Sequence, residues 1–452
     1  MLCVGLYLFL EIVTDSTSFR YIMEGAVAVQ LPQEVLDSIM DNIHPRDDIQ
    51  ALKQCVLAAR CLVPAAQRIL FREVILTECG YPGMQNPPDR FLSLLGHSPH
   101  LAGYVTELEL RIVPSQWGDN LSQHPLASIL PRLQSLKKVC IRAPVERPIV
   151  TSLQISTLLG GAAMLEIRSF TLKDTTMAIH EIVALCNWLA VHGSLQDLHF
   201  LYLSAIMDWD APPQSMPSQA VPGYAPIQLR RFTIDTPWKQ TKALLRWATG
   251  STSPLRFNAL RELTVGDLTR QSSVYLPRIL DVAKDSLSCL EVTGYIAGLA
   301  SIRFNYRHLR RIAWNICVLT PRDFKTMLDE WCIVLKESRE LKLESFVISF
   351  SWTVHSLPDY PWSEFLWNEF EDSLVDSGRC AHLVLQNLYR GLARIDTDTI
   401  RKCFPLLHAS NVCDLVVIER IGDSSVLGKY DNWEYTSRSG EWKSLPPGNI
   451  FD

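Results

Sequence analysis

LRRFTI at residues 229–234 and LRELTV at residues 260–265 decide the fold, because both place apolar side chains at the same three positions. The shared pattern is apolar-x-x-apolar-x-apolar. The other instances are VTELEL at 105, LKKVCI at 136, IRSFTL at 167, LQDLHF at 195, LSCLEV at 287, LRRIAW at 309, LESFVI at 343, CAHLVL at 380 and VCDLVV at 412. One such match arises by chance in about one window in ten at this apolar content. The prediction therefore depends on the regular recurrence of the pattern, because the middle apolar positions follow one another at intervals of 22 to 37 residues.

Amphipathic stretches separate these segments, as at 177–189, 240–247, 276–283 and 324–335. A strand followed by a helix about every 30 residues predicts parallel strands with helices on their outer side. The strand pattern is typical of leucine-rich repeats, although the asparagine usual after each strand is missing here. We therefore predict an α/β fold in which residues 101–420 form an irregular leucine-rich-repeat solenoid, with parallel strands on the concave face and helices outside.

Residues 31–76 have a different pattern, which predicts three short helices. Pro32 suits the first turn of a helix, and apolar residues from Val35 to Ile43 recur at helical spacing. The motif His44-Pro45-Arg46 ends this helix, a second follows near Leu52, and Pro64 begins a third. About 45 residues bury too little surface to be robust alone, so this segment is expected to lean on a partner.

This segment resembles the F-box, the module that docks receptor proteins onto the Skp adaptor of cullin-based SCF ubiquitin ligases. The matching motifs are Leu31-Pro32-x-Glu34-Val35-Leu36-x-x-Ile39, Leu52-x-x-Cys55-Val56-Leu57, Arg60, Pro64 and Leu70-Phe71-Arg72-x-Val74. The stretch SPHLAGYVTELEL at 98–110 also looks like the first repeat of F-box proteins with leucine-rich repeats. The resemblance implies contact with the adaptor through Leu31, Pro32, Val35, Leu36, Ile39, Leu57, Arg60 and Leu62.

Two residues depart from the family pattern. Leu62 stands where the family commonly has Trp, and Ala58 stands where a larger aliphatic residue is usual. Since aromatic anchors often dominate interfaces, Leu62 predicts weaker adaptor binding than is typical. The alternative is that these helices only cap the N-terminal end of the solenoid, as terminal repeats must be capped.

The remaining segments carry weaker signals. Residues 1–30 predict an irregular extension, because their apolar run is too short to span a bilayer. Residues 77–100 read as a loop-rich connector with a short helical stretch at 91–95. The proline-rich stretch at 211–226 reads as a surface insertion, and residues 421–452 as a tail or solenoid cap.

Composition excludes several classes of function. The chain has 452 residues, 47% of them hydrophobic, and its net charge of −5 does not fit a nucleic-acid binder. Its twelve cysteines are scattered singly, which favours reduced core thiols and a cytoplasmic or nuclear location. Phosphate-binding glycine loops, GxSxG, HExxH and CxxC motifs are missing from the sequence. We expect no catalytic residue, cofactor or metal, and no nucleic-acid or membrane partner.

Polar residues between the apolar strand positions are expected to face a target protein. The candidate contacts are Glu107, Glu109, Arg111, Lys138, Arg142, Asp197, His199, Arg231 and Asp235. Their mixed signs favour a protein with matched charges over a polyanion. The resemblance implies a non-catalytic substrate receptor that binds the Skp adaptor and, through it, cullin, for protein degradation. The alternatives are a repeat scaffold with no ligase role and, more distantly, a hydrolase.

Overall fold

The computed structural model describes the chain in segments. These are residues 38, 50, 52–54, 62–78, 86–112, 124–143, 151–159, 167–192, 194–204, 226–294, 308–316, 321–337, 342–350, 364–377, 380–391, 397–409, 413–422, 430–437 and 442–445. The chain divides into two compact units. The N-terminal unit comprises Met1–Met177 and Ala184–Leu195, and the C-terminal unit comprises Ala178–Val183 and Gln196–Asp452.

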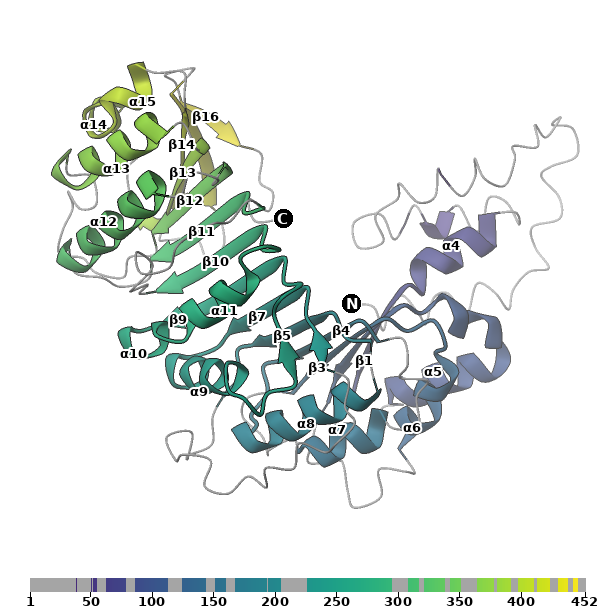
Figure 1. Cartoon of the computed structure of the whole chain (residues 1–452). Coiled ribbons are helices and arrows are strands. Elements are labelled where there is room, and N and C mark those ends of the chain that lie inside the picture. The colour runs from purple at the N-terminus through teal and green to yellow at the C-terminus, as the bar shows by residue number, and fades with distance from the viewer. Residues whose placement is uncertain are drawn as a thin grey trace, which may run out of the picture. The chain divides into compact units, whose positions relative to one another are not determined.

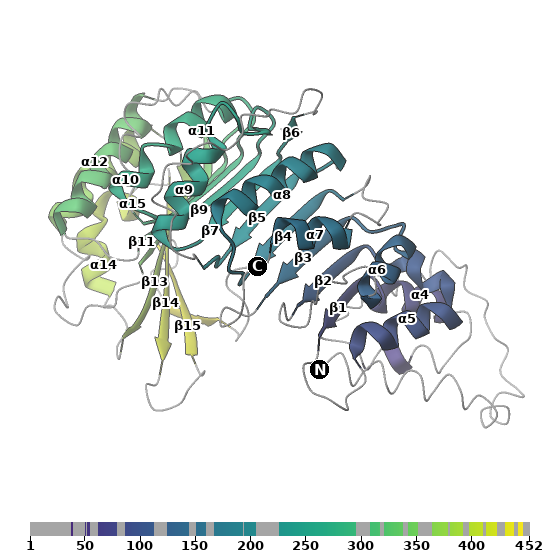
Figure 2. The same ribbon diagram turned by 90° about the horizontal axis from the view of Figure 1, so that it is seen from below.

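Within its described segments, the N-terminal unit contains four parallel strands that pair in chain order. They are β1 (Glu73–Thr77), β2 (Glu107–Arg111), β3 (Lys138–Arg142) and β4 (Ser169–Lys173). The helices are α4 (Val63–Leu70), α5 (Pro87–His97), η2 (Pro99–Tyr104), α6 (Pro125–Ile129), η5 (Leu130–Arg132) and α7 (Ser152–Leu159), and α8 (Ile179–His192) crosses the division between the units. The helices α5, α6 and α7 lie along one face of these strands (Figures 1 and 2).

The C-terminal unit contains eight further parallel strands among its described residues. They are β5 (Asp197–Leu201), β7 (Arg231–Asp235), β9 (Glu262–Leu268), β10 (Cys289–Gly294), β11 (Arg311–Ile316), β12 (Leu343–Phe350), β13 (Cys380–Gly391) and β14 (Asp414–Gly422). The strands β15 (Tyr430–Thr436) and β16 (Trp442–Leu445) follow in antiparallel pairing, so the segment read from sequence as a tail or cap contains two strands. The short strands β6 (Ile227–Gln228) and β8 (Leu255–Arg256) form a separate parallel pair.

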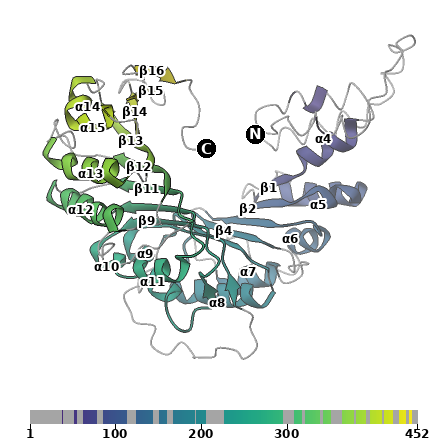
Figure 3. The ribbon, with the colours of Figure 1, turned by 45° about the horizontal axis from the view of Figure 1, so that its top comes forward.

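Helices connect most of these parallel strands. They are α9 (Trp238–Ala248), α10 (Arg270–Ser273), α11 (Leu276–Ala283), α12 (Pro321–Glu337), α13 (Glu364–Ser377), α14 (Thr397–Cys403) and α15 (Pro405–Ala409). The helices α12 and α13 lie beside each other on the helix side of β12 (Figure 3). Aromatic rings join these layers, because Phe346 of β12 stacks edge-on with Trp331 of α12 at 5.0 Å and with Phe370 of α13 at 5.5 Å.

Each predicted segment from 105 to 417 contains a strand, and the predicted middle positions meet in register. In nine neighbouring pairs the middle apolar residues are direct partners, for example Leu108 with Val139 and Phe232 with Leu263. The reason is the two-residue period of a strand, because a one-residue slip would turn every apolar side chain to the wrong face. The large side chains Phe170, Phe232 and Phe346 are fully buried at these positions.

Two backbone features repeat with the strands. The carbonyl of the residue before a strand accepts from two successive N–H groups of the next repeat, as Thr106 does from Lys137 and Lys138 and as Arg230 does from Arg261 and Glu262. The sixth residue counted from the strand start has a positive φ in β4, β5, β9 and β10, at Asp174, Tyr202, Asp267 and Gly294. Equivalent sequence positions therefore adopt equivalent backbone conformations.

The described helices agree with the predicted stretches within a few residues, and α11 covers 276–283 as predicted. In the connector, α5 is longer than the stretch predicted at 91–95, because its proline N-terminus extends it to Pro87. The extension at 1–30 lies outside the described residues, as does the predicted insertion at 211–226 except for its last residue. None of the described helices is both long and apolar enough to cross a membrane.

Candidate functional site

The face of the strands opposite the helices is the candidate site, and we call it the open face. Side chains alternate along a strand, so positions one, three and five of β2 face away from the buried Leu108 and Leu110. In each unit we name the rows that these positions form across the strands. The first row of the N-terminal unit contains Glu73, Glu107, Lys138 and Ser169, the second Ile75, Glu109, Cys140 and Thr171, and the third Thr77, Arg111, Arg142 and Lys173.

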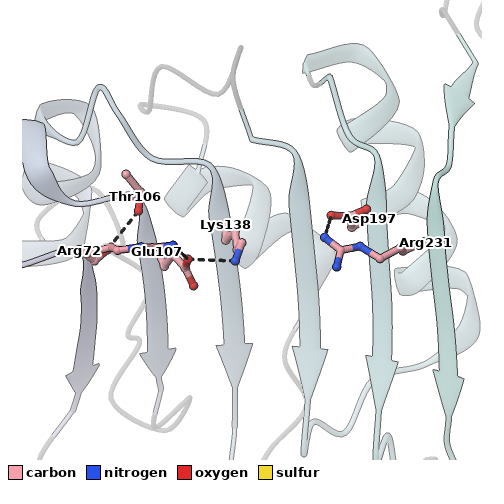
Figure 4. A network of polar contacts seen from close by, with 6 residues as sticks. All are labelled: Arg72, Thr106, Glu107, Lys138, Asp197 and Arg231. Carbon is pink, nitrogen blue, oxygen red and sulfur yellow. Dashed lines mark hydrogen bonds and ion pairs between the residues drawn. The ribbon is translucent and has the colours of Figure 1, made fainter. Parts of the chain in front are cut away.

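In the first row of the N-terminal unit, Glu107 joins neighbouring strands (Figure 4). Its Oε1 accepts from Lys138 Nζ at 2.9 Å and lies 3.9 Å from Arg72 Nη2. The Lys138 side chain is 50% exposed and that of Glu107 26%, so water screens this pair. Sequence reasoning predicted both residues on this face, and the structure brings them together.

The third row of the N-terminal unit contains two arginines, each in contact with a carboxylate. Arg111 Nε donates to Glu109 Oε1 at 2.6 Å, and Arg142 Nε lies 2.6 Å from Asp174 Oδ2. Arg111, Arg142 and Lys173 are successive register partners on three strands. Like charges directly opposite one another on a sheet destabilise it, so this row of cations is an unusual arrangement for a structural surface.

Cys140 lies between these charges in the second row. Burial and the charge of Glu109 raise the pKa of its thiol to about 11, against the lowering effects of Lys173, Arg142 and Arg111. A thiol with a raised pKa is a poor nucleophile. Burial likewise raises the pKa of Cys289 and of Cys332, and no described cysteine is in a disulfide. The raised pKa values of these three thiols are typical of structural cysteines in a core or a sheet.

The open face of the C-terminal unit begins with a short ion pair. Arg231 Nη2 donates to Asp197 Oδ2 at 2.6 Å, from neighbouring strands (Figure 4). The hydrogen bond to Asp197 raises the pKa of Arg231. The Asp197 side chain is only 10% exposed, against 44% for Arg231, so this carboxylate depends on its partner more than Glu107 does. His199 Nδ1 lies 2.9 Å from Thr233 Oγ1 in the next row.

Asp235 occupies the end of β7 beside a glycine. Burial and the nearby charge of Asp267 raise its pKa, whereas a hydrogen bond to Tyr202 lowers it. A Cβ at Gly266 would stand 2.4 Å from Asp235 Oδ1, so this glycine makes room for the carboxylate. Asp235 is therefore half-buried against Gly266, although it also lies on the open face.

Sequence reasoning missed two partners of these rows. Asp174 follows β4 in the left-handed conformation (φ 49°) and holds Arg142, and no apolar pattern marks it. Glu291 accepts from Asn315 Nδ2 at 3.1 Å, which also donates to Thr293 Oγ1 at 3.3 Å. Glu291 lies between the apolar positions of LSCLEV and Thr293 follows that segment, so the alternation could have suggested the open face for both. Their contact with Asn315 depends on β11 as the neighbouring strand.

The structure describes only part of the predicted adaptor-binding segment. Leu62 is half-buried and packs beside α4 on a small cluster of Leu52, Ala65, Ala66 and Ile69. The other predicted contacts, Leu31, Pro32, Val35, Leu36, Ile39, Leu57 and Arg60, lie outside the described residues. From α4, Gln67 Oε1 meets His100 Nε2 of η2 at 3.2 Å.

Within the described segments, His, Cys, Asp and Glu side chains nowhere gather in threes that could hold a metal ion. The chain matches no protein-family model and no curated protein. What the structure defines is a class of architecture, a mixed α/β protein whose parallel strands have helices on one face and charged residues on the other.

Proposed function

We propose that the chain is the substrate-recognition subunit of an SCF-type ubiquitin ligase. Residues 31–76 would dock on the Skp adaptor as an F-box, and an irregular leucine-rich-repeat solenoid over residues 101–420 would bind the target protein. The observation that carries the proposal is the register of the strands, in which the middle residues of successive predicted repeats are direct partners. Repeated strand–helix units stacked in this way provide an extended surface for a protein partner.

The charges of the open face support a protein partner. Acidic and basic residues of neighbouring strands pair with one another at two places, Glu107–Lys138 and Asp197–Arg231. A partner with charges of both signs can exchange with such pairs, whereas a long polyanion would meet Glu73, Glu107 and Glu109 on the same face. The net charge of −5 also disfavours a nucleic acid.

The F-box assignment rests on the resemblance of residues 31–76. The small cluster of Leu52, Ala65, Ala66 and Ile69 supports it, because such a cluster holds short helices together but buries little surface. A module of this size gains from a partner that covers its remaining apolar side chains.

The chemistry in this proposal belongs to other subunits. The receptor holds the target near a ubiquitin-charged enzyme and so raises the effective concentration of the reacting groups. The chain itself needs no nucleophile, which agrees with the raised pKa values of Cys140, Cys289 and Cys332.

Co-purification with the Skp adaptor tests the proposal. The full chain should retain the adaptor through size-exclusion chromatography, and Leu36→Asp or Ile39→Asp should abolish that retention. Ser38→Asp is the matched control, since it adds the same charge between them at an exposed position and should leave binding intact. Failure of the unchanged chain to bind the adaptor would favour the alternative, a repeat scaffold with no ligase role.

A further inference from the structure

Two buried cysteines lie side by side where the strands β13 and β14 begin. Cys380 is the first residue of β13, and Cys413 directly precedes β14. Each is only 1% exposed, and both are free thiols in the structure. They are 33 residues apart in the sequence, so the pairing of β13 with β14 is what brings them together.

The register of these strands gives the two cysteines the separation that a disulfide requires. His382 is the register partner of Asp414. One residue earlier in the same register, Cys413 is opposite Ala381 and diagonal to Cys380. Strands about 4.8 Å apart, with a rise of about 3.3 Å per residue, put the two cysteine Cα atoms about 6 Å apart. Disulfides join Cα atoms that are about 4.4–6.8 Å apart, so little backbone movement is needed here.

The two thiols are also in contact. The Cys380 thiol is hydrogen-bonded to that of Cys413, and this contact together with burial raises the pKa of Cys380 well above its usual value. Cys380 Sγ also lies 3.2 Å from the carbonyl oxygen of His382, which can accept its proton in a hydrogen bond. Because Cys380 keeps its proton, Cys413 is the thiol that reacts first with an oxidant. Cys380 is then already in place to complete the disulfide.

The pair is buried directly beneath exposed residues. Ala381 and His382, which follow Cys380, are both exposed. Opening of one or two residues at the start of β13 therefore uncovers the sulfurs, and chain segments at the ends of elements open most readily. His382 Nδ1 lies 3.5 Å from Asp414 Oδ2, so this contact links the two strand starts when they close again.

We infer that Cys380 and Cys413 are an oxidative modification site, at which a peroxide produces a reversible disulfide between β13 and β14. The sulfur of Cys413 attacks one oxygen of hydrogen peroxide, the O–O bond breaks, and water leaves as Cys413 becomes a sulfenic acid. The sulfur of Cys380 then attacks that of Cys413, and the sulfenic hydroxyl leaves with the Cys380 proton as a second water. Two thiols lose two electrons in total, and one peroxide is reduced to two waters. A dithiol reverses the reaction by thiol–disulfide exchange.

The disulfide would close a loop that contains α14 and α15, which lie between these two strands in the chain. A reducing compartment keeps such a pair as thiols until an oxidant is supplied. Closing the loop restricts the unfolded chain, so the oxidised form is expected to be the more stable one. The site lies outside residues 31–76, and the inference does not depend on the proposed ligase role.

Peptide mapping of the full chain tests the inference. The reduced chain is treated with hydrogen peroxide, its remaining thiols are blocked with N-ethylmaleimide, and it is digested with trypsin without reductant. Trypsin releases Cys380 in peptide 380–390. It releases Cys413 in peptide 403–420, which also contains Cys403. We expect these two peptides to be cross-linked, with fragmentation assigning the bond to Cys413 and dithiothreitol removing it.

Substitutions and thermal unfolding give independent readouts. Cys380→Ser and Cys413→Ser should each remove the cross-link. Cys289→Ser is the matched control, because it removes a more exposed thiol of the same unit and should leave the cross-link intact. Oxidation should raise the thermal unfolding midpoint of the unchanged chain by about 5 °C, and dithiothreitol should reverse this rise. Cys413→Ser should show no such rise.

The peptide map of the unchanged chain does not depend on the folding of any variant. The inference is overturned if Cys380 and Cys413 both carry the maleimide after oxidation, or if the cross-link joins Cys380 to Cys403. A cross-link that forms only in urea would also overturn it, because the folded strands would then not bring the thiols together. An equal rise of the midpoint in Cys413→Ser would assign the effect to other thiols and refute this site.

Discussion

At the scale of single residues, burial decides how much each ion pair of the open face contributes. Lys138–Glu107 and Arg231–Asp197 each join a basic and an acidic side chain at the first positions of neighbouring strands. The Glu107 side chain is 26% exposed and that of Asp197 10%. Loss of the cation leaves Glu107 in water but leaves Asp197 nearly buried and unpaired.

We therefore expect unequal effects from two matched substitutions. Arg231→Gln should lower the free energy of unfolding by about 1–3 kcal/mol, because a nearly buried charge loses its partner. Lys138→Gln should lower it by less than about 1 kcal/mol, as exposed pairs do. Urea unfolding followed by circular dichroism measures both, and equal losses would show that the burial of Asp197 does not matter.

Glu371 is the residue whose protonation should be visible in stability. Burial raises its pKa to about 7 from 4.5, although the N–H groups of Leu407 and Leu406 lower it. The Leu407 N–H donates to Glu371 Oε1 at 2.7 Å, which joins α13 to the start of α15. Since the folded state holds this proton more tightly than the unfolded state, the contribution of Glu371 to stability is fully present below pH 4.5 and is lost as the pH rises from about 4.5 to 7.

Glu371→Gln should remove that part of the pH dependence, because the amide oxygen can still accept from Leu407. The unfolding midpoint, followed by tryptophan fluorescence between pH 5 and pH 8, should fall with pH in the unchanged chain and fall less in the variant. Glu369→Gln, at an exposed position on the same helix, should keep the slope of the unchanged chain. An identical slope in Glu371→Gln would contradict the assignment.

At the scale of elements, glycines at the ends of strands permit close contact between repeats. Gly294 ends β10 with φ +99°, and a Cβ there would stand 2.4 Å from the carbonyl oxygen of Leu268 on β9. The register of β10 and β9 shifts between Val292 and Gly294, so the glycine lies at an irregularity of the sheet. The carbonyl oxygen of Leu268 belongs to the backbone, so it cannot move aside as the end of a flexible side chain could.

Gly294→Ala should therefore destabilise the chain by at least about 1–3 kcal/mol, from strain at positive φ together with the steric contact. Gly96→Ala is the opposite case, because Gly96 lies in α5 with no atom within 4 Å of its added Cβ. It should stabilise α5 by up to about 1 kcal/mol, since alanine favours helices. Denaturant unfolding of both variants checks the sign, and a neutral Gly294→Ala would show that the strand end can move.

At the scale of the whole molecule, the two proposed binding functions use different residues and should be separable. Residues 31–76 are proposed to hold the adaptor, and the open face of the strands to hold the target. Leu36→Asp should lose the adaptor but keep target binding, and Arg231→Gln on the open face should keep the adaptor but weaken target binding. Measuring both partners on each variant checks this, and loss of both by one folded variant would contradict the separation.

The sequence alone determined where the parallel strands of residues 105–417 lie, but it did not show the antiparallel strands β15 and β16. Segments such as LRRFTI and LRELTV carry three apolar side chains at fixed spacing, and only one register buries them all on the helix side. The polar positions between them, such as Glu107 and Arg231, were predictable as open-face residues for the same reason. Local side-chain alternation is sufficient for both predictions.

Only the tertiary structure decided which charges meet. Arg142 could have paired with Glu109 or Asp174, and the turn of the chain at φ 49° gives it Asp174. Glu371 meets Leu407 only because α13 and α15 pack together, 36 residues apart in sequence. Such contacts depend on the orientation of side chains from distant segments, and an apolar repeat pattern does not encode that orientation.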